Sequence, residues 1–388
     1  MKKYLIQTLG CKINQSESAS LERQLFYHGY EATNNIENAD LIIINTCTVT
    51  NRTDYKSRNL IKKAINAKSI NKNICIIVTG CYSQRQREEI LKSGNIDLIL
   101  DNNNKDMLLP YLNGNKDFIF NEIDTFDTFN DISFSDSGIK TCKSSLQSPI
   151  LSRQRAFIKI QDGCDNFCTY CAVPYARGKP RSRSLDSILN EINWYLSYGY
   201  HDLVVSGINL GLYNSDGNSL SDLLKILSKH SYNGLELNSI CLSSIEPDLF
   251  SDDLLDTISC LQKITPHFHI PLQSGSDEIL RIHNRKYNVS DVTSLVERLR
   301  IIKPACKIGF DVIVGLPHES DFHFEQTFNY IKSINVSYLH VFVYSKRKGT
   351  VAANMSGQVH GTIAKKRSKL LLSMNLSFHT IPKGLIAT

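Results

Sequence analysis

Short apolar runs rich in β-branched residues alternate with helical patterns along most of this chain, and this alternation constrains the fold more than any other feature. Within residues 3–101 the runs are Lys3–Leu9, Asp40–Thr46, Ile74–Thr79 and Asp97–Leu100. Short runs that are apolar throughout are typical of strands buried on both faces of a parallel sheet. Because helical patterns separate them, we expect a small open α/β domain.

The first helix of this domain is predicted to begin at a side-chain cap. Asn14 is followed three residues later by Glu17, the spacing of an N-cap residue and its reciprocal partner. The apolar residues Leu21, Leu25 and Phe26 follow at helical spacing. We therefore expect a helix that opens at Asn14.

The alternation resumes with longer units after residue 155. The predicted strands are Ala156–Gln161, Asp202–Ser206, Leu235–Leu242, His267–Leu272, Gly309–Val314 and Tyr338–Tyr344. The helical patterns between them include Ser187–Tyr198, Leu220–Ser228, Val289–Ile302 and Phe322–Ile334. Six β/α units predict a partial or full barrel of parallel strands, with its site at the carboxyl ends of the strands.

Composition divides the chain into parts. Residues 102–152 are rich in Asn, Asp, Ser and Thr and have little periodic apolar content, which indicates a linker. The expected parts are an N-terminal domain at 1–112, a linker at 113–152, a barrel at 153–350, and a C-terminal helix around Lys365–Met374 with a tail, at 351–388.

The eleven cysteines indicate metal binding or catalysis rather than disulfides. Their number is odd, and the N-terminus lacks the apolar stretch of an export signal. No apolar run is long enough to cross a bilayer. We therefore expect a cytoplasmic protein, in a reducing compartment, without a membrane partner. The formal net charge of +6 is compatible with nucleic-acid binding but does not establish it.

Cys164, Cys168 and Cys171 form a C-x3-C-x2-C loop directly after the first predicted barrel strand. Such a loop brings three thiolates within reach of one metal centre, and iron–sulfur clusters are bound by cysteine thiolates. Three ligands leave one iron of a cubane open to a chelating cofactor. The spacing resembles the signature of the radical S-adenosylmethionine superfamily. The alternatives are a three-cysteine zinc site or a chance cluster, but no histidine lies nearby at zinc spacing.

Cys11, Cys47 and Cys81 are far apart in sequence, but each directly follows a predicted strand of the N-terminal domain. Parallel strands present their carboxyl ends at one edge of the sheet, where α/β proteins bind ligands. We therefore expect these three thiols to converge and bind a second metal centre. The alternative is that they are small buried residues, as we expect for Cys75.

Two cysteine trios in this order resemble the radical S-adenosylmethionine methylthiotransferase family. Residues Thr8–Ser18 and Asn45–Thr50 look like the branch that acts on threonylcarbamoyladenosine in tRNA. The resemblance extends from about residue 3 to about residue 374, with further matches at 172–183, 243–247, 271–277 and 311–317. It implies an α/β chain in which a small open parallel-sheet domain is followed by a partial (β/α)6 radical S-adenosylmethionine barrel.

The resemblance also implies the chemistry. Two 4Fe-4S clusters, one on each trio, work with S-adenosylmethionine. One molecule of the cofactor methylates sulfur on the first cluster, and another is cleaved to a radical that activates carbon-2 of threonylcarbamoyladenosine, just 3′ of the anticodon. The implied partners are the tRNA anticodon stem-loop, an electron donor and a sulfur source, the last two unidentified.

Four residues are candidates for holding S-adenosylmethionine. Asn209 ends the second barrel strand, where the superfamily holds the amino group of the cofactor. Glu246 and Gln273 follow the third and fourth strands, and Tyr170 lies between two cysteines, where it would pack on the cluster or on adenine. The alternative for each polar residue is that it satisfies backbone groups at a strand end. Asp311 begins a strand segment, which favours a structural role.

A basic run follows the second trio and is a candidate for phosphate contacts with RNA, consisting of Arg177, Lys179, Arg181 and Arg183. The alternative is a solvated charged face. Family members generally end in a small RNA-binding TRAM domain, and the roughly 30 residues after Val359 are too few for one. We therefore expect weakened tRNA affinity, or a partner that supplies it.

Other functions remain open. The chain could methylthiolate isopentenyladenosine in tRNA or an aspartate of a ribosomal protein. It could also be a non-enzymatic iron–sulfur redox protein, although the C-x3-C-x2-C spacing speaks against that.

Overall fold

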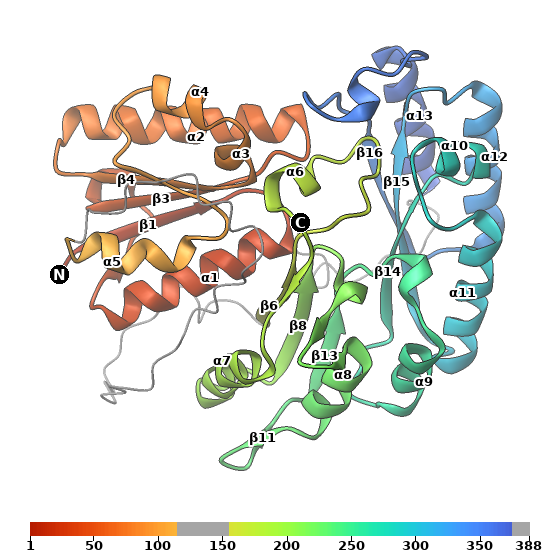
Figure 1. Cartoon of the computed structure of the whole chain (residues 1–388), viewed down its shortest axis with the longest axis horizontal. Coiled ribbons are helices and arrows are strands. Elements are labelled where there is room, and N and C mark those ends of the chain that lie inside the picture. Colours follow the sequence, from red (N-terminus) through yellow and green to blue (C-terminus); the bar gives the residue numbers. More distant parts are fainter. Residues whose placement is uncertain (115–154, 375–388) are drawn as a thin grey trace. The chain divides into compact units, whose positions relative to one another are not determined.

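The protein is described from a computed structural model, at residues 1–114 and 155–374 (Figure 1). Nearly all of the predicted linker, and the end of the predicted tail, lie outside the described residues. The chain forms two compact units, the first consisting of Met1–Asp165 with Ala172–Ile240 and the second of Asn166–Cys171 with Cys241–Thr388. The predicted domain boundaries stay predictions.

The first unit begins with a five-stranded parallel sheet in the order β2-β1-β3-β4-β5. Its strands are β1 (Lys3–Thr8), β2 (Glu31–Ala32), β3 (Leu41–Thr46), β4 (Cys75–Gly80) and β5 (Leu98–Leu100). Its helices are α1 (Lys12–Tyr27), α2 (Asn51–Ile70), α3 (Cys81–Arg85), α4 (Arg87–Lys92) and α5 (Leu108–Leu112). The four predicted strands are confirmed to within one residue at each end, and the edge strand β2 was not predicted.

The central strand β3 is buried on both faces of this sheet. Ile42 and Ile44 pack in one apolar cluster with residues of α2, and Leu41 and Ile43 pack in another with residues of α1. Each fully buried branched side chain stabilises the fold by roughly 1.5–3 kcal/mol relative to exposure. The strand ends that carry the predicted cysteines are therefore held by a core on either side.

The first helix does not begin at the predicted cap. It starts two residues earlier, with Cys11 at the N-cap position and no side-chain cap hydrogen bond. Asn14 lies inside the helix, where its Nδ2 donates to the carbonyl oxygens of Leu9 at 2.7 Å and Thr46 at 2.9 Å. Glu17 is buried and ion-paired. The capping prediction is wrong because both side chains reach partners outside the helix.

A second sheet has the order β13-β8-β6-β7, in which β8 lies parallel and β7 antiparallel to β6. Its strands are β6 (Ala156–Asp162), β7 (Arg181–Ser182), β8 (Asp202–Gly207) and β13 (Ser239–Leu242). The helices along this part of the chain are α6 (Val173–Arg177), α7 (Leu185–Ser197) and α8 (Leu220–Lys229). A short hairpin precedes α8, formed by β9 (Asn214–Ser215) and β10 (Asn218–Ser219).

The predicted strand Leu235–Leu242 is divided in two. Its first part, β12 (Leu235–Glu236), pairs antiparallel with β11 (Ser231–Tyr232), and only its last part is β13. Asn233 and Gly234, between β11 and β12, have φ angles of 51° and 78°. Two positive φ angles are the requirement of a type I′ hairpin turn, for which Asn-Gly is the preferred sequence. The prediction of one continuous strand is wrong because it overlooked this turn signal.

The second unit contains a three-stranded parallel sheet in the order β14-β15-β16. Its strands are β14 (His267–Gln273), β15 (Lys307–Val314) and β16 (Tyr338–Val343). Its helices are α9 (Asp252–Cys260), α10 (Asp277–Ile282), α11 (Val289–Ile302), α12 (Asp321–Ile334) and α13 (Gly361–Met374) (Figure 1).

The predicted fold class is confirmed. An open parallel sheet is followed by six strands that alternate with helices, namely β6, β8, β13, β14, β15 and β16. Among the described residues, no helix combines the length and the apolar character needed to cross a membrane.

Candidate functional site

The structure brings together Cys11, Cys47 and Cys81, which follow the carboxyl ends of β1, β3 and β4. Cys47 and Cys81 are buried and Cys11 is exposed. Burial raises the pKa of Cys47 to about 12, and the neighbouring thiols of Cys11 and Cys81 add to this shift. Cys81 likewise interacts with Cys11. Cys11 and Cys81 therefore lie close enough to Cys47 to add to its pKa shift, because β3 pairs in parallel with both β1 and β4.

The close approach of two of these loops depends on Gly10. Its φ of +104° lies in the region that favours glycine. A Cβ atom at this position would lie 2.7 Å from the Sγ atom of Cys47. A side chain here would therefore displace the thiol, and the missing Cβ leaves room beside it.

Arg177, the last residue of α6, is fully buried and contacts one member of this trio. Its Nε donates to the Sγ atom of Cys81 at 3.2 Å. Its Nη1 donates to Glu17 Oε1 at 2.8 Å and to Asp162 Oδ1 at 2.9 Å, and its Nη2 donates to Asn14 Oδ1 at 2.9 Å. One guanidinium therefore connects a thiol of the trio to carboxylates of α1 and β6.

Two lysines complete this charge network. Lys159 Nζ lies 3.0 Å from Glu17 and 2.9 Å from Asp162, and Lys105 also pairs with Glu17. Burial alone would raise the pKa of both carboxyl groups, but Arg177 and the lysines hold the pKa of each well below its usual range. Both carboxylates are therefore ionised at neutral pH, and the buried charges compensate one another.

The basic run proposed for RNA contacts is mostly buried, and its RNA-binding role stays a prediction. Arg177, Arg181 and Arg183 are buried, and only Lys179 of the four is exposed. Arg181 donates to the carbonyl oxygen of Arg177 at 3.0 Å. Arg183 donates to Ser187 Oγ and pairs with a buried carboxylate of α7.

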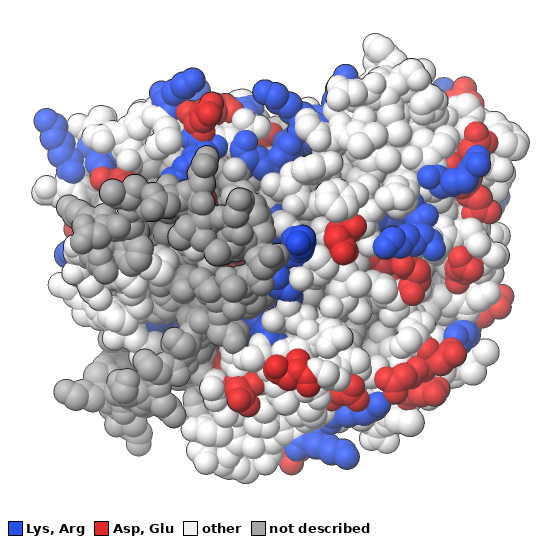
Figure 2. Space-filling view, viewed as in Figure 1, with Lys and Arg blue, Asp and Glu red and all other residues white. Residues whose placement is uncertain are grey.

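Arg177 pairs with Glu17, 160 positions away, and Arg181 donates to Asn103, 78 positions away, so the run alone could not show that these side chains are internal. On the face shown in Figure 2, lysine and arginine side chains lie among aspartate and glutamate side chains. The phosphate contacts proposed for the run stay a prediction, and Lys179 is its exposed member.

The second trio lies on the loop after β6. The boundary between the two units crosses this loop, so that Cys164 belongs to the first unit and Cys168 and Cys171 to the second. In the first unit, the backbone N–H of Cys164 donates to the carbonyl oxygen of Gly178 at 3.0 Å. In the second, the N–H of Cys171 donates to the carbonyl oxygen of Cys168 at 2.9 Å. Both parts of the loop are thus held by backbone hydrogen bonds.

Arg285 is a residue of this region that sequence reasoning missed. Its Nη1 donates to Cys168 Sγ at 3.1 Å and to the Tyr170 hydroxyl at 3.4 Å, and its Nη2 pairs with Glu246. Its Nε donates to the Tyr287 hydroxyl at 3.0 Å. Arg285 thus brings two predicted cofactor residues, Tyr170 and Glu246, to one thiol. The only sequence signal is a basic residue in a loop, which is too common to be specific.

Asn209 differs from the other predicted residues because its side chain lacks partners. It is 3% exposed, and neither Nδ2 nor Oδ1 has a hydrogen-bond partner among the described residues. Its backbone N–H donates to Gln161 Oε1 at 2.8 Å, which fixes its position after β8. Buried amides are normally paired, so one left unpaired calls for an explanation, and an absent ligand is one.

Gln273 ends β14 with a φ of +63°, which is rare for a residue with a side chain. The register of β14 with β15 shifts at the same point. Such backbone strain is concentrated at ligand sites.

The donor chemistry fits cluster binding. Metal ligation requires thiolates, and buried thiols ionise only if positive charge is brought to them. Burial raises the pKa of Cys47 and Cys81, so their ionisation requires positive charge in addition to that of Arg177. Bound metal would supply the rest.

Two parts of the chain match known families. Residues 3–101 match the uncharacterized protein family UPF0004, and residues 158–331 match the radical SAM superfamily. Threonylcarbamoyladenosine tRNA methylthiotransferase MtaB of Bacillus subtilis is 34% identical over 95% of this chain and 79% of the relative. The protein of the same name from Aquifex aeolicus is 35% identical over 96% and 88%. The tRNA-2-methylthio-N(6)-dimethylallyladenosine synthase of Syntrophus aciditrophicus is 34% identical over 99% and 81%.

A solved structure of similar fold is the radical S-adenosylmethionine methyltransferase TsrM of Kitasatospora setae, with cobalamin and a [4Fe-4S] cluster bound. The TM-score is 0.65 at 13% identity, over 91% of this chain and 77% of that one. At this identity the likeness concerns the fold alone.

Proposed function

This chain belongs to the radical S-adenosylmethionine tRNA methylthiotransferase family, and we propose that its substrate is threonylcarbamoyladenosine beside the anticodon, modified at carbon-2. Family membership makes the chain an enzyme whose cofactors are 4Fe-4S and S-adenosylmethionine. The adenine C–H bond has no useful acidity, so acid–base chemistry alone cannot replace its hydrogen. When bound, the cofactors supply the radical and sulfur chemistry that this bond requires.

The proposal assigns one 4Fe-4S cluster to each cysteine trio. Cys11, Cys47 and Cys81 would hold the cluster that carries sulfur. The position of these three cysteines directly after three neighbouring parallel strands is the observation that carries this part of the proposal. Cys164, Cys168 and Cys171 would hold the cluster that binds S-adenosylmethionine, as their C-x3-C-x2-C spacing indicates.

The surrounding residues have positioning roles in this proposal. Arg177 and Arg285 each donate a hydrogen bond to one cysteine sulfur, Cys81 and Cys168 respectively, and thereby hold it in place. Asn209 would hold polar groups of S-adenosylmethionine with the amide atoms that lack partners among the described residues. Glu246, Gln273 and Tyr170 are the other proposed cofactor contacts.

The choice of substrate rests on the sequence around the first cysteine. Relatives named for threonylcarbamoyladenosine and for dimethylallyladenosine match the chain at nearly the same identity, so identity alone does not separate them. The segment Thr8–Ser18 resembles the former branch, and this favours threonylcarbamoyladenosine. A base in the anticodon loop is accessible in the way that single-stranded RNA sites are. The non-enzymatic redox alternative is set aside because the relatives are enzymes.

The cluster assignment is tested with a matched pair of variants, Cys47→Ala and Cys168→Ala. After anaerobic reconstitution, the parent should contain about eight irons per chain and each variant about four. Reductive cleavage of S-adenosylmethionine should survive in Cys47→Ala and be lost in Cys168→Ala. An unchanged iron content in Cys47→Ala would overturn the assignment of the first trio, and the matched control is Cys75→Ala, which should keep its full iron content.

The substrate is tested by expression in a bacterial strain that lacks its own methylthiotransferases. Mass spectrometry of tRNA nucleosides should show the methylthio derivative of threonylcarbamoyladenosine and no methylthio derivative of the dimethylallyl nucleoside. The opposite pattern would assign the chain to the other branch.

A further inference from the structure

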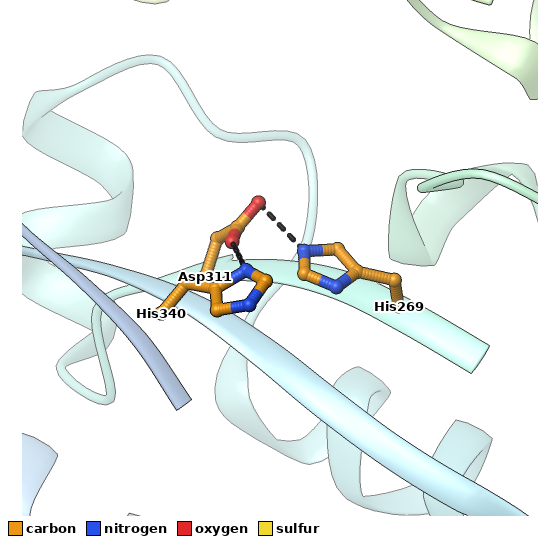
Figure 3. A group of neighbouring side chains, drawn as sticks. All are labelled: His269, Asp311 and His340. Carbon is orange, nitrogen blue, oxygen red and sulfur yellow. Dashed lines mark hydrogen bonds and ion pairs between the residues drawn. The ribbon is translucent and has the colours of Figure 1, made fainter. Parts of the chain in front are cut away.

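A group of metal-ligating side chains outside both cysteine trios lies on the sheet of the second unit. His269 of β14, Asp311 of β15 and His340 of β16 converge from three neighbouring strands (Figure 3). Asp311 lies opposite His340 in the strand register. One ligand atom from each residue lies within 4.8 Å of the other two. The carboxylate of Asp311 lies between the two rings, 2.8 Å from His269 Nε2 and 3.2 Å from His340 Nδ1.

These residues occupy the face of the sheet opposite to the unit's core. Their neighbours Phe268, Phe310 and Leu339 alternate with them along the strands and are buried on the other face. The side chains of His269, Asp311 and His340 are 11%, 23% and 45% exposed. A bound ion would therefore have room for further ligands.

The orientation of His269 is fixed by Tyr338. The Tyr338 hydroxyl lies 3.0 Å from His269 Nδ1, which leaves Nε2 directed at Asp311. The Tyr338 ring stacks on His267 at 5.5 Å and crosses Gly309 so closely that a Cβ atom there would lie 1.9 Å from a ring carbon. Metal-binding histidines are usually held in this way by a hydrogen bond to the second ring nitrogen.

The donor set selects the class of ion. Two imidazoles and one carboxylate are ligands of zinc and other first-row divalent ions with an open coordination position, whereas Mg²⁺ and Ca²⁺ prefer all-oxygen sites.

We propose that His269, Asp311 and His340 bind one divalent transition-metal ion, through Nε2, a carboxylate oxygen and Nδ1 respectively. The remaining coordination positions face away from the core and are open to water or to an oxygen or nitrogen donor. This site is additional to the clusters, and it does not depend on the proposed substrate.

The proposal is tested by zinc binding to the anaerobically reconstituted enzyme. After incubation with zinc sulfate and removal of free metal, elemental analysis should find about one zinc per chain in addition to the cluster iron. Asp311→Asn and His340→Ala should lose nearly all of this zinc while iron and sulfide stay unchanged. Tyr338→Phe, which keeps the ring but removes the hydroxyl, should weaken zinc binding about tenfold.

Phe342→Ala is the matched control because Phe342 lies two residues beyond His340 on the same strand and has no ligand atom. It should bind zinc like the parent. X-ray absorption at the zinc edge should show nitrogen and oxygen neighbours only. Sulfur neighbours, no zinc in the parent, or equal zinc in parent, Asp311→Asn and His340→Ala would each overturn the proposal.

Discussion

Two buried arginines in different parts of the molecule make the same contact with a cysteine sulfur. Arg177 Nε lies 3.2 Å from Cys81 Sγ in the first unit, and Arg285 Nη1 lies 3.1 Å from Cys168 Sγ in the second. The two contacts are alike, but the side chains around Arg177 carry more charge than those around Arg285.

Arg177 is held by the carboxylates of Glu17 and Asp162, to which two buried lysines also pair. These cations lower the pKa of Glu17 more than burial raises it, so the pKa lies well below its usual value. Arg285 is held by one carboxylate, Glu246, and by tyrosine hydroxyls. Burial raises the pKa of Glu246 more than the positive charge of Arg285 lowers it, so the pKa is raised overall. The first sulfur contact therefore belongs to a charge network on which folding depends, whereas the second can change at smaller cost.

The largest expected effect is that of Arg177→Met. It leaves Glu17 and Asp162 with less compensation, and breaking a buried ion pair costs about 3–5 kcal/mol. Urea unfolding followed by the fluorescence of Trp194, the only tryptophan, reports on the first unit. Lys179→Met, exposed and two residues beyond Arg177, should change stability by less than about 0.5 kcal/mol. Equal effects of the two substitutions would show that the network does not stabilise the first unit.

Arg285→Met should cost less, about 1–3 kcal/mol, because a glutamate with a raised pKa can take up a proton when its partner is lost. Hydrogen–deuterium exchange of the backbone amides of β14–β16 measures this loss of stability in the second unit. Lys286→Met, exposed at the next position, is the control. A loss as large as that from Arg177→Met would remove the distinction between the two sites.

Acidification should affect the two glutamates in opposite directions. The folded-state pKa of Glu17 is lowered, so its contribution to stability is complete above the ordinary carboxylate pKa and is lost as the pH falls through the lowered value. The folded-state pKa of Glu246 is raised, so lowering the pH through that value favours the folded state. Carboxyl ¹³C shifts of glutamate-labelled protein, assigned with Glu17→Gln and Glu246→Gln, should show Glu246 protonating first. The reverse order would contradict the comparison.

The smallest effect on folding is expected for Asn209→Ala, since the Asn209 side chain has no hydrogen-bond partner among the described residues. Stability should change by less than about 1 kcal/mol. The affinity for S-adenosylmethionine should fall about tenfold, the equivalent of one hydrogen bond of about 1.4 kcal/mol. Calorimetric titration measures this, with the exposed Asn214→Ala as control. Unchanged affinity would mean that the cofactor does not use this amide.

The sequence by itself determined the elements and the positions of the cysteines on them. Apolar runs and their spacing located four of the five parallel strands of the first sheet to within a residue. Because parallel strands end at one edge, the convergence of Cys11, Cys47 and Cys81 could be predicted. These are local properties, since periodicity and turn chemistry act over a few residues. The hairpin at Asn233 and Gly234 was equally local, and its turn signal was present but overlooked.

Only the tertiary structure decided which charges face each other. Arg177 meets Glu17 across 160 positions of sequence, and Arg285 meets Cys168 across 117. The same holds for Asn14, which joins two loops instead of capping a helix. A charged side chain has the same chemistry on the surface and in the interior. Its role depends on whether folding brings an opposite charge to it, and the local sequence does not predict such a long-range pair.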